Sequence, residues 1–304
     1  MEWNLQKSLL SAFGLLLLLG SAAQWVTLLR RRRLPIASPS EIAANDISPP
    51  RDPNLTSDGN STAPAVPTAE PDEIIPAAHY TKPGRISGQA VIATLLWVGL
   101  SLFSSIRDEL GMAPEADPSL DAVQLSCLIN FALWGFMAWL LTDHGKRSFA
   151  EWGGRFPPRN YDVELGTKTF LLILLPVFVL LLATATFRSE ENQHQFLQLL
   201  HDDATAATLF WLTVAAVVLA PLSEELMFRV ILQGWLLARW PRHAAIVGTA
   251  LLFAAVHGWP DAIPLIPLAL ILGYVNYHFR NYTAVVLAHA LFNGLNLFLS
   301  VSSS

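Results

Sequence analysis

Ionisable and carboxamide side chains lie inside strongly hydrophobic segments in the C-terminal third of this chain. They form three groups along the sequence: Glu224, Glu225 and Arg229, then His257 four residues after Phe253, and then His289 with Asn293. An ionised side chain in hydrocarbon costs at least ~2.5 kcal/mol, so residues of these types in such segments indicate a functional site. Carboxylate, imidazole and carboxamide groups together can move protons and stabilise an oxyanion, which are the two needs of amide hydrolysis.

The spacing of these residues predicts which of them face each other. Glu225 and Arg229 are four residues apart, so on a helix their opposite charges lie on one face and offset the cost of burying both. Glu224 is rotated by about 100° from Glu225 and has no partner on its own helix. A carboxylate in this position is suited to take and return a proton.

The other two groups follow the same helical spacing. Phe253 and His257 are four residues apart, which allows the ring to pack against the imidazole, and His289 and Asn293 also share a face. Asn296 extends that face by one further turn.

Depth within the membrane allows the three groups to meet. At ~1.5 Å per residue, Glu224 and His257 lie about 25 and 21 Å from the turn at 241–243 that joins their helices. On the same scale His289 and Asn293 lie about 12 and 18 Å from the turn near Asn281, and helix tilt can close the difference. We therefore predict one cluster of Glu224, His257, His289 and Asn293 inside the membrane.

The cluster is compatible with two hydrolytic mechanisms. Glutamate and histidine can activate water directly, or they can bind a divalent metal such as zinc that lowers the pKa of its own water. The sequence lacks the His-Glu-x-x-His motif of common zinc peptidases. No serine or cysteine has an evident base partner, which disfavours the serine and cysteine mechanisms.

The composition of the whole chain indicates a membrane protein. Of its 304 residues 53% are hydrophobic and 14% are charged, against about 45–50% and 25% in an ordinary soluble domain. The formal net charge of −5 argues against a nucleic-acid partner, which needs a basic surface. The single cysteine, Cys127, lies in an apolar run and predicts a buried structural thiol.

We therefore predict an all-α fold, a polytopic transmembrane helix bundle of about eight spans. The expected spans are 8–29, 87–106, 120–141, 169–187, 205–240, 244–257, 262–279 and 282–300. The fifth would be about 54 Å long as one straight helix, so it must tilt, protrude or break near Pro221. Basic residues fall in alternate loops, which predicts that these loops are cytoplasmic and that both termini lie outside.

The chain divides into three parts by composition. Residues 1–33 predict an N-terminal transmembrane anchor ending in the basic run 30–33, and a cleaved signal peptide is the alternative because 21–23 are small residues. Residues 34–84 are rich in Pro, Ser, Thr, Asp and Asn and predict a disordered linker. Residues 85–304 predict the membrane-embedded body, with a motif-bearing core at about 205–300.

The three motifs resemble those of the CPBP family of intramembrane proteases, named for CAAX processing and bacteriocin processing, which includes the type II CAAX prenyl endopeptidase. The motifs are Glu-Glu-x-x-x-Arg at 224–229, Phe-x-x-x-His at 253–257 and His-x-x-x-Asn at 289–293, in the family's order. The resemblance covers roughly 205–300 and says little about the first 84 residues.

This resemblance implies an endopeptidase in which Glu224 and His257 activate the attacking water. It implies that His289 and Asn293 form the oxyanion site, and that Glu225 and Arg229, with Phe253, support these residues. The family has been described both as metal-dependent and as using a glutamate-activated water. A metal, where one is used, would have Glu224, His257 and His289 as its ligands.

The expected partners are membrane lipid and a membrane-associated protein or peptide substrate, including lipid-modified ones, and the expected location is the plasma (inner) membrane. Two other functions stay open. One is a membrane immunity or scaffold protein that keeps the family fold without cleavage. The other is a transporter or proton relay, which also places acids and histidines within the membrane, although the sequence shows no pair of matching halves of the kind many transporters have.

Overall fold

The computed structural model describes residues 2–31, 86–112, 119–187, 199 and 205–303, and this part of the chain is helical without strands. Seven of its helices are long and apolar enough to cross a membrane. These helices confirm the predicted polytopic bundle, and the chain is a membrane protein. The predicted linker at 34–84 lies outside the described residues, so the proposed division into domains stays a prediction.

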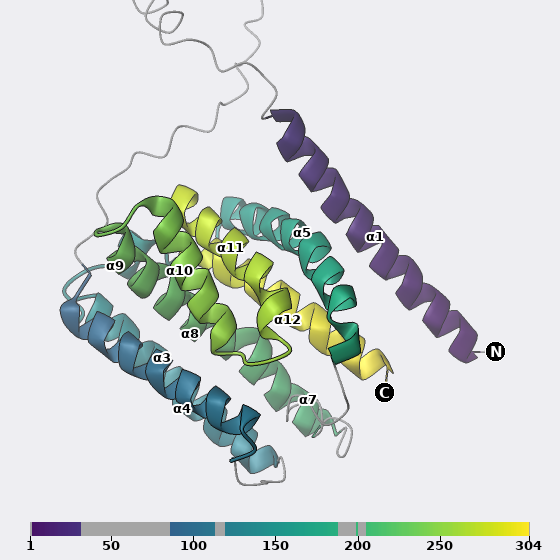
Figure 1. Cartoon of the computed structure of the whole chain (residues 1–304), viewed down its shortest axis with the longest axis horizontal. Coiled ribbons are helices and arrows are strands. Elements are labelled where there is room, and N and C mark those ends of the chain that lie inside the picture. The colour runs from purple at the N-terminus through teal and green to yellow at the C-terminus, as the bar shows by residue number, and fades with distance from the viewer. Residues whose placement is uncertain (1, 32–85, 113–118, 188–198, 200–204, 304) are drawn as a thin grey trace, which may run out of the picture. The chain divides into compact units, whose positions relative to one another are not determined.

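One long helical segment at the centre of the bundle carries the first motif. It runs from α7 (Ala206–Thr213) through η4 (Val214–Leu219), α8 (Ala220–Glu225) and η5 (Leu226–Leu232) to α9 (Gln233–Leu237). The helices α3 (Gly88–Glu109) and α4 (Leu120–Leu141) pack on one side of it, as Figure 1 shows. On the other side lie α5 (Asn160–Ala183), α10 (Arg242–Ala255), α11 (Ala262–Phe279) and α12 (Tyr282–Ser303).

This central segment does not break at Pro221. The backbone stays helical on both sides of the proline, and η4 and η5 are π-helices that flank α8. A proline has no N–H, and its ring collides with the carbonyl four residues earlier in an α-helix. The wider π turn before Pro221 relieves that collision and keeps the helix continuous.

The segment predicted as a span at 244–257 forms α10, which has 14 residues. A helix of that length is about 21 Å long, short of a hydrocarbon core of ~30 Å. It ends at Ala255 because the chain turns at 256–261 and returns as α11, so this helix is not among the seven of spanning length.

Helix α5 begins at Asn160, nine residues before the predicted apolar span at 169–187. Its first turns are polar, and the Asp162 carboxylate accepts the N–H of Arg159 at 2.9 Å, which caps the helix. The same buried carboxylate accepts from Asn281 Nδ2 at 2.6 Å and from Arg155 Nη1 at 3.0 Å. These contacts fix the start of α5 beside the turn that leads into α12.

Helix α1 (Glu2–Arg31) contacts α5 where Pro176 interrupts the hydrogen-bond ladder. Because Pro176 has no N–H, the carbonyl of Leu172 lacks its usual helical donor. The indole Nε1 of Trp25 donates to that carbonyl at 3.0 Å, and the buried Ser21 Oγ accepts the N–H of Leu175 at 3.0 Å. The bond from Trp25 replaces the donor that Pro176 cannot supply to the Leu172 carbonyl, and lipid offers no donor of its own.

Candidate active site

Three helices bring the carboxylate and imidazole groups together. Glu224 lies on α8, His257 follows the end of α10, and His289 lies on α12. The Glu224 Oε2 atom is 3.8 Å from His289 Nε2 and 4.0 Å from His257 Nε2. Neither distance is that of a hydrogen bond, so both nitrogens face the carboxylate across a gap that a water or substrate oxygen can bridge.

The cluster is only partly covered by the protein. The side chain of His257 is 29% exposed and that of Glu224 is 17% exposed, whereas that of His289 is 3% exposed. One side of the cluster is therefore accessible to a substrate, while the other rests on the bundle core.

Glu225 and Arg229 form a buried ion pair behind this cluster. Their side chains have no exposed area, and Arg229 Nε lies 3.2 Å from Glu225 Oε2 in a geometry that is not a hydrogen bond. The guanidinium carbon of Arg229 lies 4.7 Å from the ring centroid of Phe253, a cation–π contact. The second carboxylate oxygen, Glu225 Oε1, is 2.9 Å from His289 Nδ1.

The acceptor beside each imidazole determines which ring nitrogen carries a proton. His257 Nδ1 is 2.7 Å from the Phe253 carbonyl oxygen, which only accepts, so Nδ1 donates. His289 Nδ1 donates to Glu225 Oε1 by the same reasoning. In the neutral imidazoles the two Nε2 atoms therefore carry lone pairs, and both face Glu224.

Phe253 fixes the orientation of both rings. It is buried, its ring centroid lies 4.6 Å from that of His257, and its edge meets His289 at 5.8 Å. The aromatic residue in the second motif therefore packs against each histidine of the site as well as against Arg229.

Asn293 follows His289 by one turn of α12, and its Nδ2 atom donates to the carbonyl oxygen of Ala216 on η4 at 2.8 Å. The carboxamide is thus tied to the central segment. Asn296, one turn further, is exposed, so it does not extend the site as its spacing suggested.

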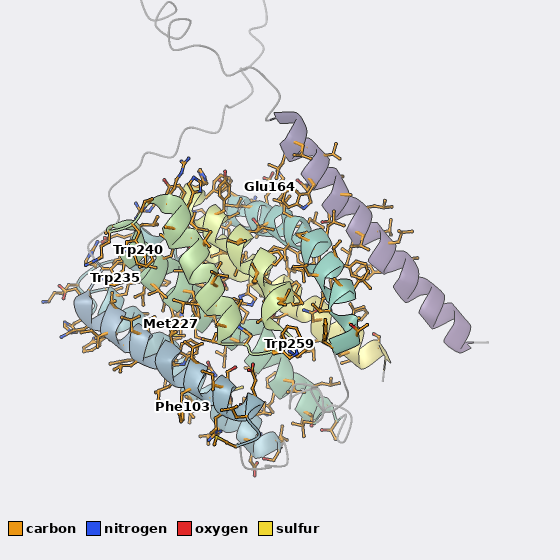
Figure 2. All side chains as sticks on the ribbon, viewed as in Figure 1. Phe103, Glu164, Met227, Trp235, Trp240 and Trp259 are labelled. Carbon is orange, nitrogen blue, oxygen red and sulfur yellow. The ribbon has the colours of Figure 1, made fainter. Side chains whose placement is uncertain are left out.

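A contact that the motifs do not reveal holds the loop after His257. The N–H of Trp259 donates to Glu109 Oε1 of α3 at 2.7 Å, and Gly258 has a φ of 69°. A Cβ atom at Gly258 would lie 2.7 Å from Ser105 Oγ, so only glycine fits there. The Trp259 ring, labelled in Figure 2, meets Phe187 edge-on at 5.3 Å.

Polar residues of α4 and α12 support α8 from the other side. The hydroxyl of the buried Tyr282 donates to the Leu222 carbonyl at 2.7 Å and accepts from Trp134 Nε1 at 3.0 Å. Ser223 Oγ lies 3.4 Å from Asn130 Oδ1 of α4. Single polar residues in apolar segments are the only sequence signal for these contacts, and that signal does not identify the partner.

The described residues contain no group of three or more His, Cys, Asp or Glu side chains arranged to hold a metal ion. Glu224, His257 and His289 approach each other, with Glu224 Oε2 at 4.0 Å from His257 Nε2 and 3.8 Å from His289 Nε2, and their role as metal ligands stays a prediction. Cys127 is buried on α4 with its Sγ 3.8 Å from the Trp211 carbonyl oxygen, as predicted for a structural thiol.

Comparison with known proteins found a matching family model. Residues 206–295 match the family model described as type II CAAX prenyl endopeptidase Rce1-like. Comparisons with curated proteins and with solved structures gave no significant match. The matched segment includes all three motifs, and it supports the resemblance of this part of the chain to the CAAX proteases of the CPBP family.

Proposed function

We propose that this chain is an intramembrane endopeptidase that hydrolyses a peptide bond with a water activated by Glu224 and His257. One observation carries the proposal: a partly exposed carboxylate lies within 4.0 Å of two imidazole Nε2 atoms whose Nδ1 atoms are already bonded. Acceptor groups that converge in this way suit a bound water, because the water can donate one hydrogen to Glu224 and the other to an imidazole Nε2.

In the first step Glu224 takes a proton from the water while the water oxygen attacks the carbonyl carbon of the substrate. His257 orients that water through the lone pair on Nε2, since its Nδ1 is held by Phe253. The peptide C–N bond then breaks, and the proton on Glu224 passes to the departing amine. Glu224 thus acts first as a base and then as an acid, which returns it to its starting state.

Asn293 and His289 stabilise the negative charge on the substrate oxygen in this proposal. Asn293 uses one amide hydrogen for the Ala216 carbonyl and has a second for the oxyanion. His289 Nε2 donates only when the ring carries both protons, because Nδ1 donates to Glu225 in either form. Each fixed donor of this kind contributes about 10²–10³ in rate.

The proposed steps use a water activated by protein side chains alone. The alternative, in which zinc or another divalent metal is held by Glu224, His257 and His289, has a direct test. It requires metal bound to the purified chain and loss of activity on chelation that is restored by adding the metal back.

We further propose that the protein lies in the plasma membrane and acts on membrane-associated proteins or peptides, including lipid-modified ones. The support is the apolar setting of the site between spanning helices, which favours a substrate already held at the membrane. The family model is named for prenyl endopeptidases, which makes a lipid-modified C-terminal segment the first substrate to examine.

The test compares new protein N-termini and released peptides in membranes of host cells that express wild-type or Glu224→Gln protein at matched levels. Glu164→Gln is the matched control, because Glu164 is exposed on α5 and pairs with Lys168. We expect products with the wild-type and control proteins and none with Glu224→Gln. Identical profiles for all three would instead favour a non-catalytic scaffold or immunity protein.

A further inference from the structure

The π-helix before the catalytic glutamate leaves one backbone carbonyl without a backbone donor. In a π-helix each N–H bonds to the carbonyl five residues earlier. The N–H of Ala220 accordingly donates to the Ala215 carbonyl. The next residue in this register is Pro221, whose partner would be the Ala216 carbonyl, and proline has no N–H to give.

The Ala216 carbonyl is the group to which Asn293 is bonded. Asn293 Nδ2 donates to it at 2.8 Å from α12, 77 positions further along the chain. The residues involved lie within helices long and apolar enough to span a membrane, where an unpaired backbone carbonyl is costly. The bond therefore satisfies a group that would otherwise be unpaired, and it holds the carboxamide in one orientation.

We propose that Pro221 is a positioning residue for Asn293. Because Pro221 has no N–H, it leaves the Ala216 carbonyl available to Asn293. The hydrogen bond from Asn293 Nδ2 to this carbonyl then sets the direction of the other Nδ2 hydrogen. The catalytic effect of Pro221 rests on the proposed function, whereas its effect on the hydrogen bond between Asn293 and Ala216 does not. An oxyanion donor that is fixed before the substrate arrives needs no reorganisation in the transition state.

A stability measurement tests, without any substrate, whether Pro221 leaves the Ala216 carbonyl available to Asn293. Apparent melting temperatures are compared for the purified full chain in detergent as wild type, Asn293→Leu, Pro221→Ala and the double variant. We expect Asn293→Leu to lower the melting temperature clearly in the wild type and much less in the Pro221→Ala background, where the new N–H of residue 221 satisfies Ala216. Equal decreases in the two backgrounds would overturn the proposal.

Two further variants keep this test decisive. Pro267→Ala removes a proline inside α11, and it should leave the effect of Asn293→Leu unchanged. Pro221→Leu repeats the cycle with a larger side chain in case Pro221→Ala yields too little folded protein. If Pro267→Ala reduced the effect of Asn293→Leu on the melting temperature as much as Pro221→Ala does, the proposal would also be contradicted. The reduction would then be a general effect of removing a proline.

The catalytic arm measures cleavage of a synthetic peptide that spans a wild-type-specific cleavage site. We expect Pro221→Ala to lower kcat by about 10- to 100-fold with KM within about twofold, because a displaced donor affects the transition state more than binding. An unchanged kcat beside a positive stability cycle would show that the bond exists but does not position a donor. If wild type itself cleaves nothing, the proposed function fails, and the stability cycle still decides whether Pro221 leaves the Ala216 carbonyl available to Asn293.

Discussion

Two adjacent glutamates on α8 have opposite surroundings, and this difference supports the roles proposed for them. Glu224 is partly exposed and faces two imidazole nitrogens at 3.8 and 4.0 Å. Glu225 is fully buried between Arg229 and His289. A carboxylate fixed by two buried partners is poorly placed to exchange protons with a substrate, whereas one that faces an opening is well placed.

We therefore expect Arg229→Ala to impair folding rather than chemistry. Removing one partner of a buried ion pair leaves an uncompensated charge, which costs about 3–5 kcal/mol. The yield of monodisperse protein and its melting temperature in detergent should fall sharply, while the kcat of the remaining folded fraction changes little. Lys168→Ala is the control, because Lys168 is exposed and pairs with Glu164 on the surface of α5. Wild-type yield and melting temperature for Arg229→Ala would contradict this assignment.

Much of the site could be predicted from residue spacing. A separation of four residues placed Glu225 opposite Arg229 and Phe253 beside His257. Similar depths predicted that Glu224 lies near His257, and helix tilt was needed to bring in the shallower His289. The link between Glu225 and His289 could not be predicted in this way, because it joins two helices whose rotation depends on packing rather than on spacing. The catalytic roles of Glu224, His257, His289 and Asn293 stay predictions.

The loop at 256–261, between α10 and α11, is held by contacts with α3. Glu109 at the end of α3 accepts the N–H of Trp259, and Gly258 approaches Ser105 closely. The His257 backbone directly precedes these contacts, so the position of its imidazole relative to Glu224 depends on the loop.

Glu109→Ala should loosen this loop. Hydrogen–deuterium exchange of peptides that cover 254–262 should be faster in the variant, because the Trp259 amide loses its acceptor. Glu109→Gln keeps an acceptor oxygen and should restore most of the protection. Asp108→Ala is the matched control, since Asp108 pairs with Arg107 rather than with the loop. Exchange that is the same in Glu109→Ala and wild type would show that the contact does not hold the loop.

The helical elements themselves were largely predictable, and the exceptions have physical causes. The ends of the apolar runs in the sequence predicted both ends of α4 and of α11 correctly. Apolar length missed the first nine residues of α5, because capping by Asp162 begins the helix in a polar segment. It also could not reveal the π-helices around Pro221, since the same apolar residues suit an α or a π turn.

For the whole molecule, the assembly of the bundle depends on contacts between segments far apart in sequence. The buried Asp162 carboxylate binds Arg155 from the preceding loop and Asn281 from the turn before α12. The start of α12 is thereby set against α5, and His289 and Asn293 lie on the following turns of that helix.

Asp162→Ala should destabilise this end of the bundle. The variant loses a helix cap and leaves Asn281 and Arg155 without their acceptor, at a combined cost of about 2–4 kcal/mol, discounted because Arg155 is partly exposed. A melting temperature several degrees below wild type is the expected result. Glu164→Ala, two residues further along α5 and exposed, should melt as wild type does. Equal melting temperatures for the two variants would contradict the structural role of Asp162.

The central claim, that Glu224 activates the water for peptide-bond cleavage, is tested most directly with purified protein. Wild type and Glu224→Gln are reconstituted in liposomes with a peptide that spans a cleavage site identified in host membranes, and product is quantified by mass spectrometry. We expect cleavage by wild type, and a decrease of at least about 10³-fold for a Glu224→Gln protein that inserts and melts normally, because general base catalysis and positioning of the water are both lost. Wild-type activity in the folded Glu224→Gln protein would contradict this claim.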